Sequence, residues 1–146
     1  ITTLTKEGAP LIRYRTRDLT RIIPGVCKCG CPFPRIDRIL GRSDDRIKFK
    51  AVNIYPGQIE DLVHRIPGVS SEYQILLTRK DGRDSMIFRV EIEDAEDPAK
   101  KAKTEKALGK AFKDFIGVTV DVMGVKIGEL PRSMKKTKRV IDEREL

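Results

Sequence analysis

Basic side chains crowd a short segment close to the end of the chain. Arg132, Lys135, Lys136, Lys138 and Arg139 lie within it, and the whole chain carries a formal net charge of +8 from 30 Lys and Arg against 22 Asp and Glu. A solvated surface of mixed charge accounts for the overall excess. A dense local group of cations instead favours contact with an anion. We expect any anion-handling chemistry to concentrate in this segment.

Three thiols form a second group with chemical potential. Cys27, Cys29 and Cys31 are too close together and odd in number for a disulfide framework, which fits a reducing compartment. Zinc needs four nitrogen or sulfur ligands, and this stretch supplies three thiols and no histidine. Two interpretations stay open. The cysteines are free, or Cys27 and Cys29 hold part of a zinc site that is completed by ligands from outside this sequence.

Residues 41–45 divide the chain into two parts of different character. Upstream lie short β-favouring runs broken by turns, with too little apolar area to fold alone; downstream, strand and helix patterns alternate. We therefore predict a domain boundary here, with residues 1–42 as the final strands of one domain and residues 43–146 as a second domain. Glycine and short polar residues at the boundary suit a joint.

The downstream part predicts strands and helices in a regular order. A strand or hairpin at 47–54 precedes a helix that begins at Pro56, and two alternating strands at 73–77 and 86–92 join at an Asp81-Gly82 turn. A second helix after Asp97 is followed by a strand near 118–122. The expected apolar stripes of the two helices are Ile59, Leu62, Val63 and Ile66, and Leu108, Ala111, Phe112 and Phe115. The order β-α-β-β-α-β predicts an α+β, ferredoxin-like domain with two helices on one face of a mainly antiparallel sheet.

Length and composition narrow the class of protein. The 146 residues can bury one modest core. There is no apolar run near 18 residues and no signal-like start, so we expect a piece of a soluble cytoplasmic protein without membrane contact. Aromatic residues make up 5% of the chain and form no stacking platform, which argues against a nucleic-acid partner.

Three segments carry a resemblance to a known family. Residues 41–60 read Gly-Arg-x-Asp-Asp-x-Ile-Lys-x-x-x-x-x-Ile-x-Pro-x-x-Ile-Glu, residues 14–18 read Tyr-x-Thr-x-Asp, and residues 130–142 include Leu-Pro-Arg-Ser and Arg-Val-Ile-Asp. These patterns resemble those of the acyl-adenylate-forming enzymes, and among them the phenylacetate–coenzyme A ligases. The resemblance covers nearly the whole chain.

The resemblance implies a role for several residues. Asp18 would bind the ribose hydroxyls of ATP, Arg42 ribose or phosphate oxygens, and Asp44 would be the hinge of a mobile C-terminal lid. Lys136 would be the adenylation lysine. The strand that contains Ala51, Val52 and Asn53 would line the passage for coenzyme A.

This chain departs from the family pattern at three positions where glycine is usual. They hold Arg17, Ala51 and Lys135. Phenylacetate ligases share the departure at Arg17, whereas those at Ala51 and Lys135 concern the geometry of the hinge strand and of the lysine loop.

The implied reaction has two half-reactions. A small aromatic acid and ATP, with Mg²⁺, would give an acyl-adenylate and diphosphate, and coenzyme A would then give the thioester and AMP. The partner would be an N-terminal adenylation domain of the same chain, because no phosphate loop is present here; a homodimer stays open. The alternative is a ferredoxin-like regulatory module that binds a small molecule or anion without catalysis.

Overall fold

The computed structural model describes residues 1–132 and 139–144. The chain divides into two compact units, Ile1–Arg46 and Ile47–Leu146. Within the described residues no helix is both long and apolar enough to cross a membrane.

The first unit consists of short ladders joined by loops. Strand β1 (Asp18–Leu19) pairs antiparallel with β4 (Gly41–Arg42), and β2 (Ile22–Ile23) pairs antiparallel with β3 (Arg35–Ile36). Every buried core hydrophobic among the described residues belongs to the second unit. The ladders of the first unit therefore rest on backbone pairing and surface ion pairs, as a stretch with little apolar area would predict.

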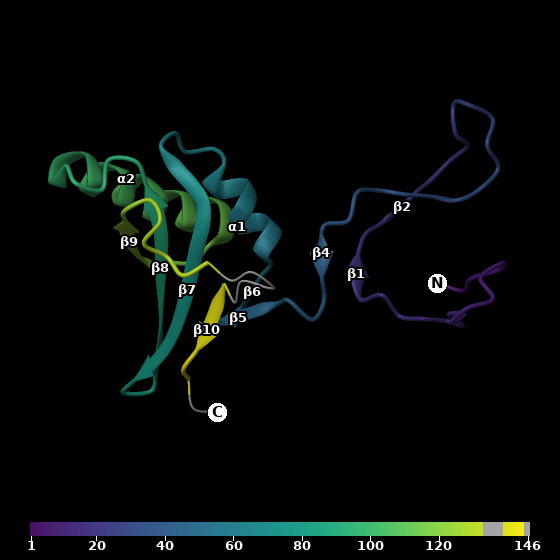
Figure 1. Ribbon diagram of the computed structural model, residues 1–146, viewed down its shortest axis with the longest axis horizontal. Coiled ribbons are helices and arrows are strands. Elements are labelled where there is room, and N and C mark those ends of the chain that lie inside the picture. The colour runs from purple at the N-terminus through teal and green to yellow at the C-terminus, as the bar shows by residue number, and fades with distance from the viewer. Residues whose placement is uncertain (133–138, 145–146) are drawn as a thin grey trace. The chain divides into compact units, whose positions relative to one another are not determined.

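A mixed four-stranded sheet forms the centre of the second unit. Its order is β10 (Val140–Asp142), β7 (Val69–Lys80), β8 (Arg83–Ile92) and β9 (Asp121–Val125) (Figure 1). Strands β7 and β8 are antiparallel around the predicted turn, where Asp81 and Gly82 have φ values of 50° and 72°. β9 runs parallel to β8, and β10 runs parallel to β7.

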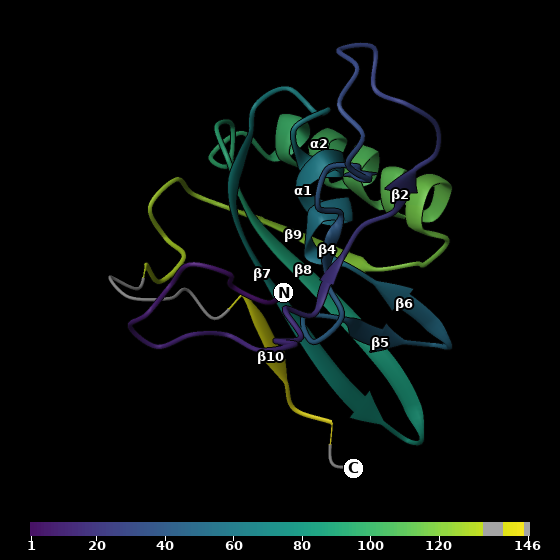
Figure 2. The ribbon, with the colours of Figure 1, turned by 90° about the vertical axis from the view of Figure 1, so that its right-hand side faces the viewer.

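Helices α1 (Pro56–Val63) and α2 (Pro98–Ala111) pack on one face of this sheet. Proline occupies the first turn of each helix, and the Asp97 carboxylate caps α2 by accepting from the backbone N–H groups of Ala99 and Lys100 at 3.0 and 3.2 Å. Figures 1 and 2 show both helices on the same side of β7 and β8. Alternate residues of the two long strands face them, as predicted: Tyr73, Ile75, Leu77, Met86, Phe88, Val90 and Ile92.

The α+β class is confirmed, but the ferredoxin-like topology is not. Residues 47–54, expected as a strand or a hairpin ahead of the first helix, form an antiparallel hairpin of β5 (Ile47–Phe49) and β6 (Val52–Ile54) that is separate from the sheet. The physical reason is a two-residue turn in which Lys50 and Ala51 have φ values of 45° and 65°, so the run reverses before it can extend. β10 instead pairs with β7, and with β9 parallel to β8 the sheet is mixed rather than mainly antiparallel.

The predicted apolar stripe of the second helix is wrong at its end. Phe112 is buried, but Phe115 is 62% exposed. The chain continues α2 as a π-helical turn, η1 (Phe112–Ile116), in which the Gly117 N–H donates to the Phe112 carbonyl at 3.1 Å. A π-turn adds a residue to the repeat, which rotates Phe115 off the stripe.

Candidate functional site

Asp18 and Arg42, far apart in the sequence, lie opposite each other in the first unit. They are Cα partners in the β1–β4 ladder. Directly opposed residues of an antiparallel pair have Cα atoms about 4.5–5.5 Å apart. A carboxylate and a guanidinium placed in this way offer hydrogen-bond acceptors and donors to one polar ligand.

Asp44 follows this ladder and is held by two guanidinium groups. Arg42 donates to both carboxylate oxygens, at 3.0 Å from Nε and 2.8 Å from Nη2, and Arg17 Nη1 lies 3.4 Å from Oδ2. The two-bond contact with Arg42 is the main reason that the pKa of Asp44 falls to about 2. Arg42 uses two of its five N–H donors here, which leaves three for another ligand.

A hollow of about 470 Å³ adjoins this ion-paired group within the first unit. Its lining comes from two stretches of chain and contains Tyr14, Arg15, Arg17, Ser43 and Asp44. Two arginines and a phenol favour an anionic or hydroxyl-rich ligand.

The β5–β6 hairpin carries the three residues assigned to the coenzyme A passage. Ala51 and Asn53 are exposed and Val52 is half-buried. Ile54 at the end of the hairpin is fully buried in the core. The hairpin is therefore anchored at Ile54, while its tip faces solvent.

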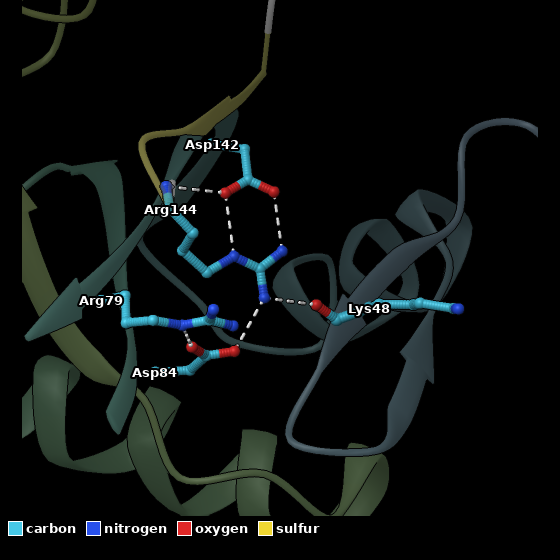
Figure 3. Close-up of polar contacts among 5 residues, drawn as sticks. All are labelled: Lys48, Arg79, Asp84, Asp142 and Arg144. Carbon is cyan, nitrogen blue, oxygen red and sulfur yellow. Dashed lines mark hydrogen bonds and ion pairs between the residues drawn. The ribbon is translucent and has the colours of Figure 1, made fainter. Parts of the chain in front are cut away.

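Arg144 bonds this hairpin to the far end of the sheet (Figure 3). Its guanidinium pairs with Asp142 at 2.7 and 2.8 Å, and Nη1 donates at 2.9 Å both to Asp84 and to the carbonyl of Lys48. Arg79 contacts the other oxygen of Asp84 at 2.7 Å. The hydrogen bonds from Arg79 and then Arg144 lower the pKa of Asp84, and Arg144 itself lowers the pKa of Asp142.

Lys136 lies outside the described residues, but both flanks of its segment are described. On one side Arg132 Nη2 contacts Glu91 at 2.9 Å. On the other side Arg139 Nη1 contacts Glu60 at 2.9 Å. The described residues on either side of residues 133–138 are therefore attached to the second unit by ion pairs.

The cysteines do not form a zinc site with the described residues. Cys27 and Cys29 are free, with Sγ atoms 3.0 Å apart. Two thiolates on one tetrahedral zinc, at about 2.3 Å each, would lie about 3.8 Å apart. No group of three or more His, Cys, Asp or Glu side chains in the described ranges could hold a metal.

The structure thus brings Asp18, Arg42 and Asp44 together and places the 51–53 tip in the second unit. Sequence reasoning missed Arg144 and Glu91. The only sequence signal for Glu91 was its place as an acidic residue between Val90 and Ile92 in an apolar alternating strand. In the structure Glu91 is 0% exposed. Arg144 gave no signal, because an arginine is usually solvated.

The sequence profile of the AMP-binding enzyme C-terminal domain matches residues 51–144. The chain belongs to this family. It is 38% identical over 148 residues to phenylacetate-coenzyme A ligase from Escherichia coli (strain K12), an alignment that covers 99% of this chain and 33% of that protein. The chain therefore spans about a third of the length of the curated relatives that it matches.

Solved structures give the same family likeness. The chain resembles 2-hydroxyisobutyryl-CoA ligase in the postadenylation state with R3-HIB-AMP, with a TM-score of 0.77 and 30% identity over 92% of this chain and 29% of that one. The same ligase with 2-HIB-AMP and CoA in the thioesterification state has a TM-score of 0.64. A domain of phenylacetate-coenzyme A ligase from Bacteroides vulgatus ATCC 8482 has a TM-score of 0.61 and 34% identity, over 70% of this chain and 95% of that one.

Proposed function

We propose that the chain is the C-terminal part of an ATP-dependent acyl-CoA ligase that converts phenylacetate, ATP and CoA into phenylacetyl-CoA, AMP and diphosphate. The observation that carries the proposal is the pairing of Asp18 with Arg42, beside Asp44, in a chain whose relatives are phenylacetate-coenzyme A ligases. The partner is an N-terminal adenylation domain of the same polypeptide, and the reaction takes place in the cytoplasm.

The first half-reaction joins the acid to AMP. The Asp18 carboxylate accepts hydrogen bonds from both ribose hydroxyls, and the N–H groups of Arg42 that Asp44 leaves free donate to ribose or phosphate oxygens. Mg²⁺ enters with ATP. The Lys136 ammonium stands between the acid carboxylate and the α-phosphate, where it offsets the repulsion of two anions and the charge that develops on the transferring phosphorus.

The second half-reaction needs a different arrangement of the same chain. Residues 43–146 act as a lid that turns about Asp44, withdraws Lys136 and presents the tip of the β5–β6 hairpin to coenzyme A. Ala51, Val52 and Asn53 then line the passage for pantetheine. The solved states of 2-hydroxyisobutyryl-CoA ligase, one postadenylation and one for thioesterification, support a two-state cycle.

The test separates the two half-reactions in the complete ligase. Lys136→Ala should lower the rate of adenylate formation by about 10²–10³-fold, measured as diphosphate release, because a preorganised charge is lost. Thioester formation from supplied phenylacetyl-adenylate and CoA should stay within about twofold of wild type on the same argument.

Lys135→Ala is the matched control, because it removes the same charge from the neighbouring position. It should leave adenylate formation nearly unchanged. Equal losses in both half-reactions for Lys136→Ala, or a larger loss for Lys135→Ala, would contradict the assigned role of Lys136.

A further inference from the structure

Glu91 is a buried charge with a specific arrangement of partners. It lies on β8 with 0% of its side chain exposed, on the face of the sheet opposite to the one that the helices cover. One carboxylate oxygen accepts from the backbone N–H of Leu130 at 3.1 Å, and the other from Arg132 Nη2 at 2.9 Å. Burying a carboxylate is costly unless it is paired and hydrogen-bonded, and these two contacts supply the pairing for Glu91.

Both partners of Glu91 lie just ahead of residues 133–138, which we call the lysine segment. Leu130 is itself buried, at 4% exposed, so its backbone N–H has a fixed place at the sheet. Arg132 is exposed along most of its side chain, at 58%, and only the Glu91 contact ties its guanidinium to the core among the described residues. The carboxylate therefore holds the chain at Leu130 and Arg132, just ahead of the lysine segment.

The other end of the lysine segment is fixed by a different set of contacts. Arg139 bonds Glu60 on α1 at 2.9 Å, and its guanidinium lies 4.6 Å from the centroid of the Tyr73 ring. Its carbonyl accepts from the Ile75 N–H at 2.7 Å, which starts the pairing of β10 with β7. Arg132 and Arg139, the described residues on either side of the lysine segment, are thus each held by contacts with the second unit.

We propose that Glu91 is a positioning residue for adenylate formation. By holding Leu130 and Arg132, opposite the Arg139 anchor, it restricts where the ammonium of Lys136 can be placed. Glu91 itself touches neither substrate nor reacting atoms. This inference rests on the proposed function, because it assumes that Lys136 acts in the first half-reaction.

The experiment uses Glu91→Gln in the complete ligase. Glutamine keeps an acceptor for the Leu130 N–H but loses the ion pair with Arg132, so the segment should be held at one contact fewer. A misplacement on the order of 1 Å at a reacting group lowers a rate by up to about 10²-fold. We expect kcat for adenylate formation to fall by about 10- to 100-fold with KM for ATP nearly unchanged, and thioester formation from supplied adenylate to stay within about twofold.

Glu105→Gln is the matched control, because Glu105 also accepts from a backbone N–H, that of Gly124 at 2.8 Å, and lies 3.9 Å from Lys101. It makes these contacts with Gly124 of β9 and Lys101 of α2, neither of which flanks the lysine segment in the sequence, and should leave both half-reactions near wild type. A merely structural role of Glu91 would lower both half-reactions together, in proportion to the folded fraction seen by circular dichroism. That result, or equal behaviour of the two variants, would overturn the proposal.

Arg132→Gln provides a second variant in case Glu91→Gln does not fold, since Arg132 is exposed. It should give the same selective loss, and in the double variant the losses should not add, because both single changes break one pair. Additive losses would overturn the pairing argument. Lys136→Ala separates the proposed function from the role of Glu91. If Lys136→Ala spares adenylate formation, the proposed function fails. If Lys136→Ala abolishes adenylate formation but Glu91→Gln and Arg132→Gln do not slow it, only the role of Glu91 fails.

Discussion

Ala51 occupies a backbone conformation that strongly favours glycine. With Lys50 at φ 45° and Ala51 at φ 65°, the β5–β6 turn has two consecutive left-handed residues. A side chain in this region costs about 1–2 kcal/mol, while glycine loses about 0.5–1 kcal/mol more entropy on folding. We predict that Ala51→Gly raises the free energy of unfolding by about 0.5–1 kcal/mol, measured by urea denaturation of this chain.

Ala102→Gly tests whether this gain comes from the turn. Ala102 is exposed within α2, where glycine should lower the free energy of unfolding by about 1 kcal/mol. The two substitutions are chemically identical and should have opposite signs. Equal signs would refute the left-handed turn.

The strained backbone at Ala51 could be predicted from the sequence only through comparison with the family pattern. Arg17 and Ala51 stand where glycine is usual, and both have positive φ, at 67° and 65°. The proposed roles of Asp18 and Arg42 likewise came from motifs, but the pairing of these two residues could not be predicted. A two-residue ladder has too few side chains to record its register in the sequence.

At the scale of elements, long alternating runs were predictable and short ones were not. β7 and β8 bury every second residue against the helices, a pattern that fixes both strand type and face. The run at 47–54 alternates as well and was compatible with a strand or a hairpin, and the backbone at Lys50 and Ala51 decides for the hairpin. β10 has three residues, and its place beside β7 depends on contacts of Arg139 and Arg144 that no local pattern encodes.

Asp84, near the start of β8, forms ion pairs with Arg79 and Arg144 and makes the stability of the second unit depend on pH. Ion pairs with Arg79 and Arg144 lower the folded pKa of Asp84 below its ordinary 3.8. Its contribution is therefore present above about pH 4 and is lost as the pH falls through the folded pKa. We predict that Asp84→Asn lowers the thermal midpoint of the chain at pH 6, and that the difference from wild type closes as the pH falls below 3.8.

Asp121→Asn is a suitable control for this titration. Asp121 is exposed at the start of β9. Its effect on the thermal midpoint at pH 6 should be small, because surface substitutions usually change stability little. A gap between wild type and Asp84→Asn that stays constant from pH 6 to pH 2.5 would contradict the ion-pair assignment.

At the scale of the whole molecule, hydrogen bonds within the second unit connect the two segments that we propose act in the two half-reactions. Arg144 follows β10 and bonds Lys48 on β5, so the strand after the lysine segment and the hairpin of the coenzyme A passage share one cluster. Such a unit would move as a body, and the change in backbone angles would fall on a few residues near the boundary after Arg46. Asp44 is the residue that the family pattern assigns to this task.

Asp44→Pro should therefore slow the overall turnover of the complete ligase while sparing at least one of the two half-reactions. Proline fixes φ near −65° and restricts the residue before it, so a joint that must adopt two conformations becomes slow or biased. We predict that overall turnover falls by at least about tenfold, a barrier increase of about 1.4 kcal/mol. Adenylate formation, or thioester formation from supplied adenylate, should be preserved in whichever state the proline favours.

Asp44→Ala separates the joint from the ion pairs. Both substitutions remove the carboxylate that binds Arg42 and Arg17, but alanine leaves φ and ψ free. If backbone rotation at this position is what the cycle requires, alanine should retain most of the turnover that proline loses. Equal turnover in the two variants would instead assign the effect to the lost ion pairs, and Asp44 would then be an anchor of the nucleotide-side ladder rather than the pivot.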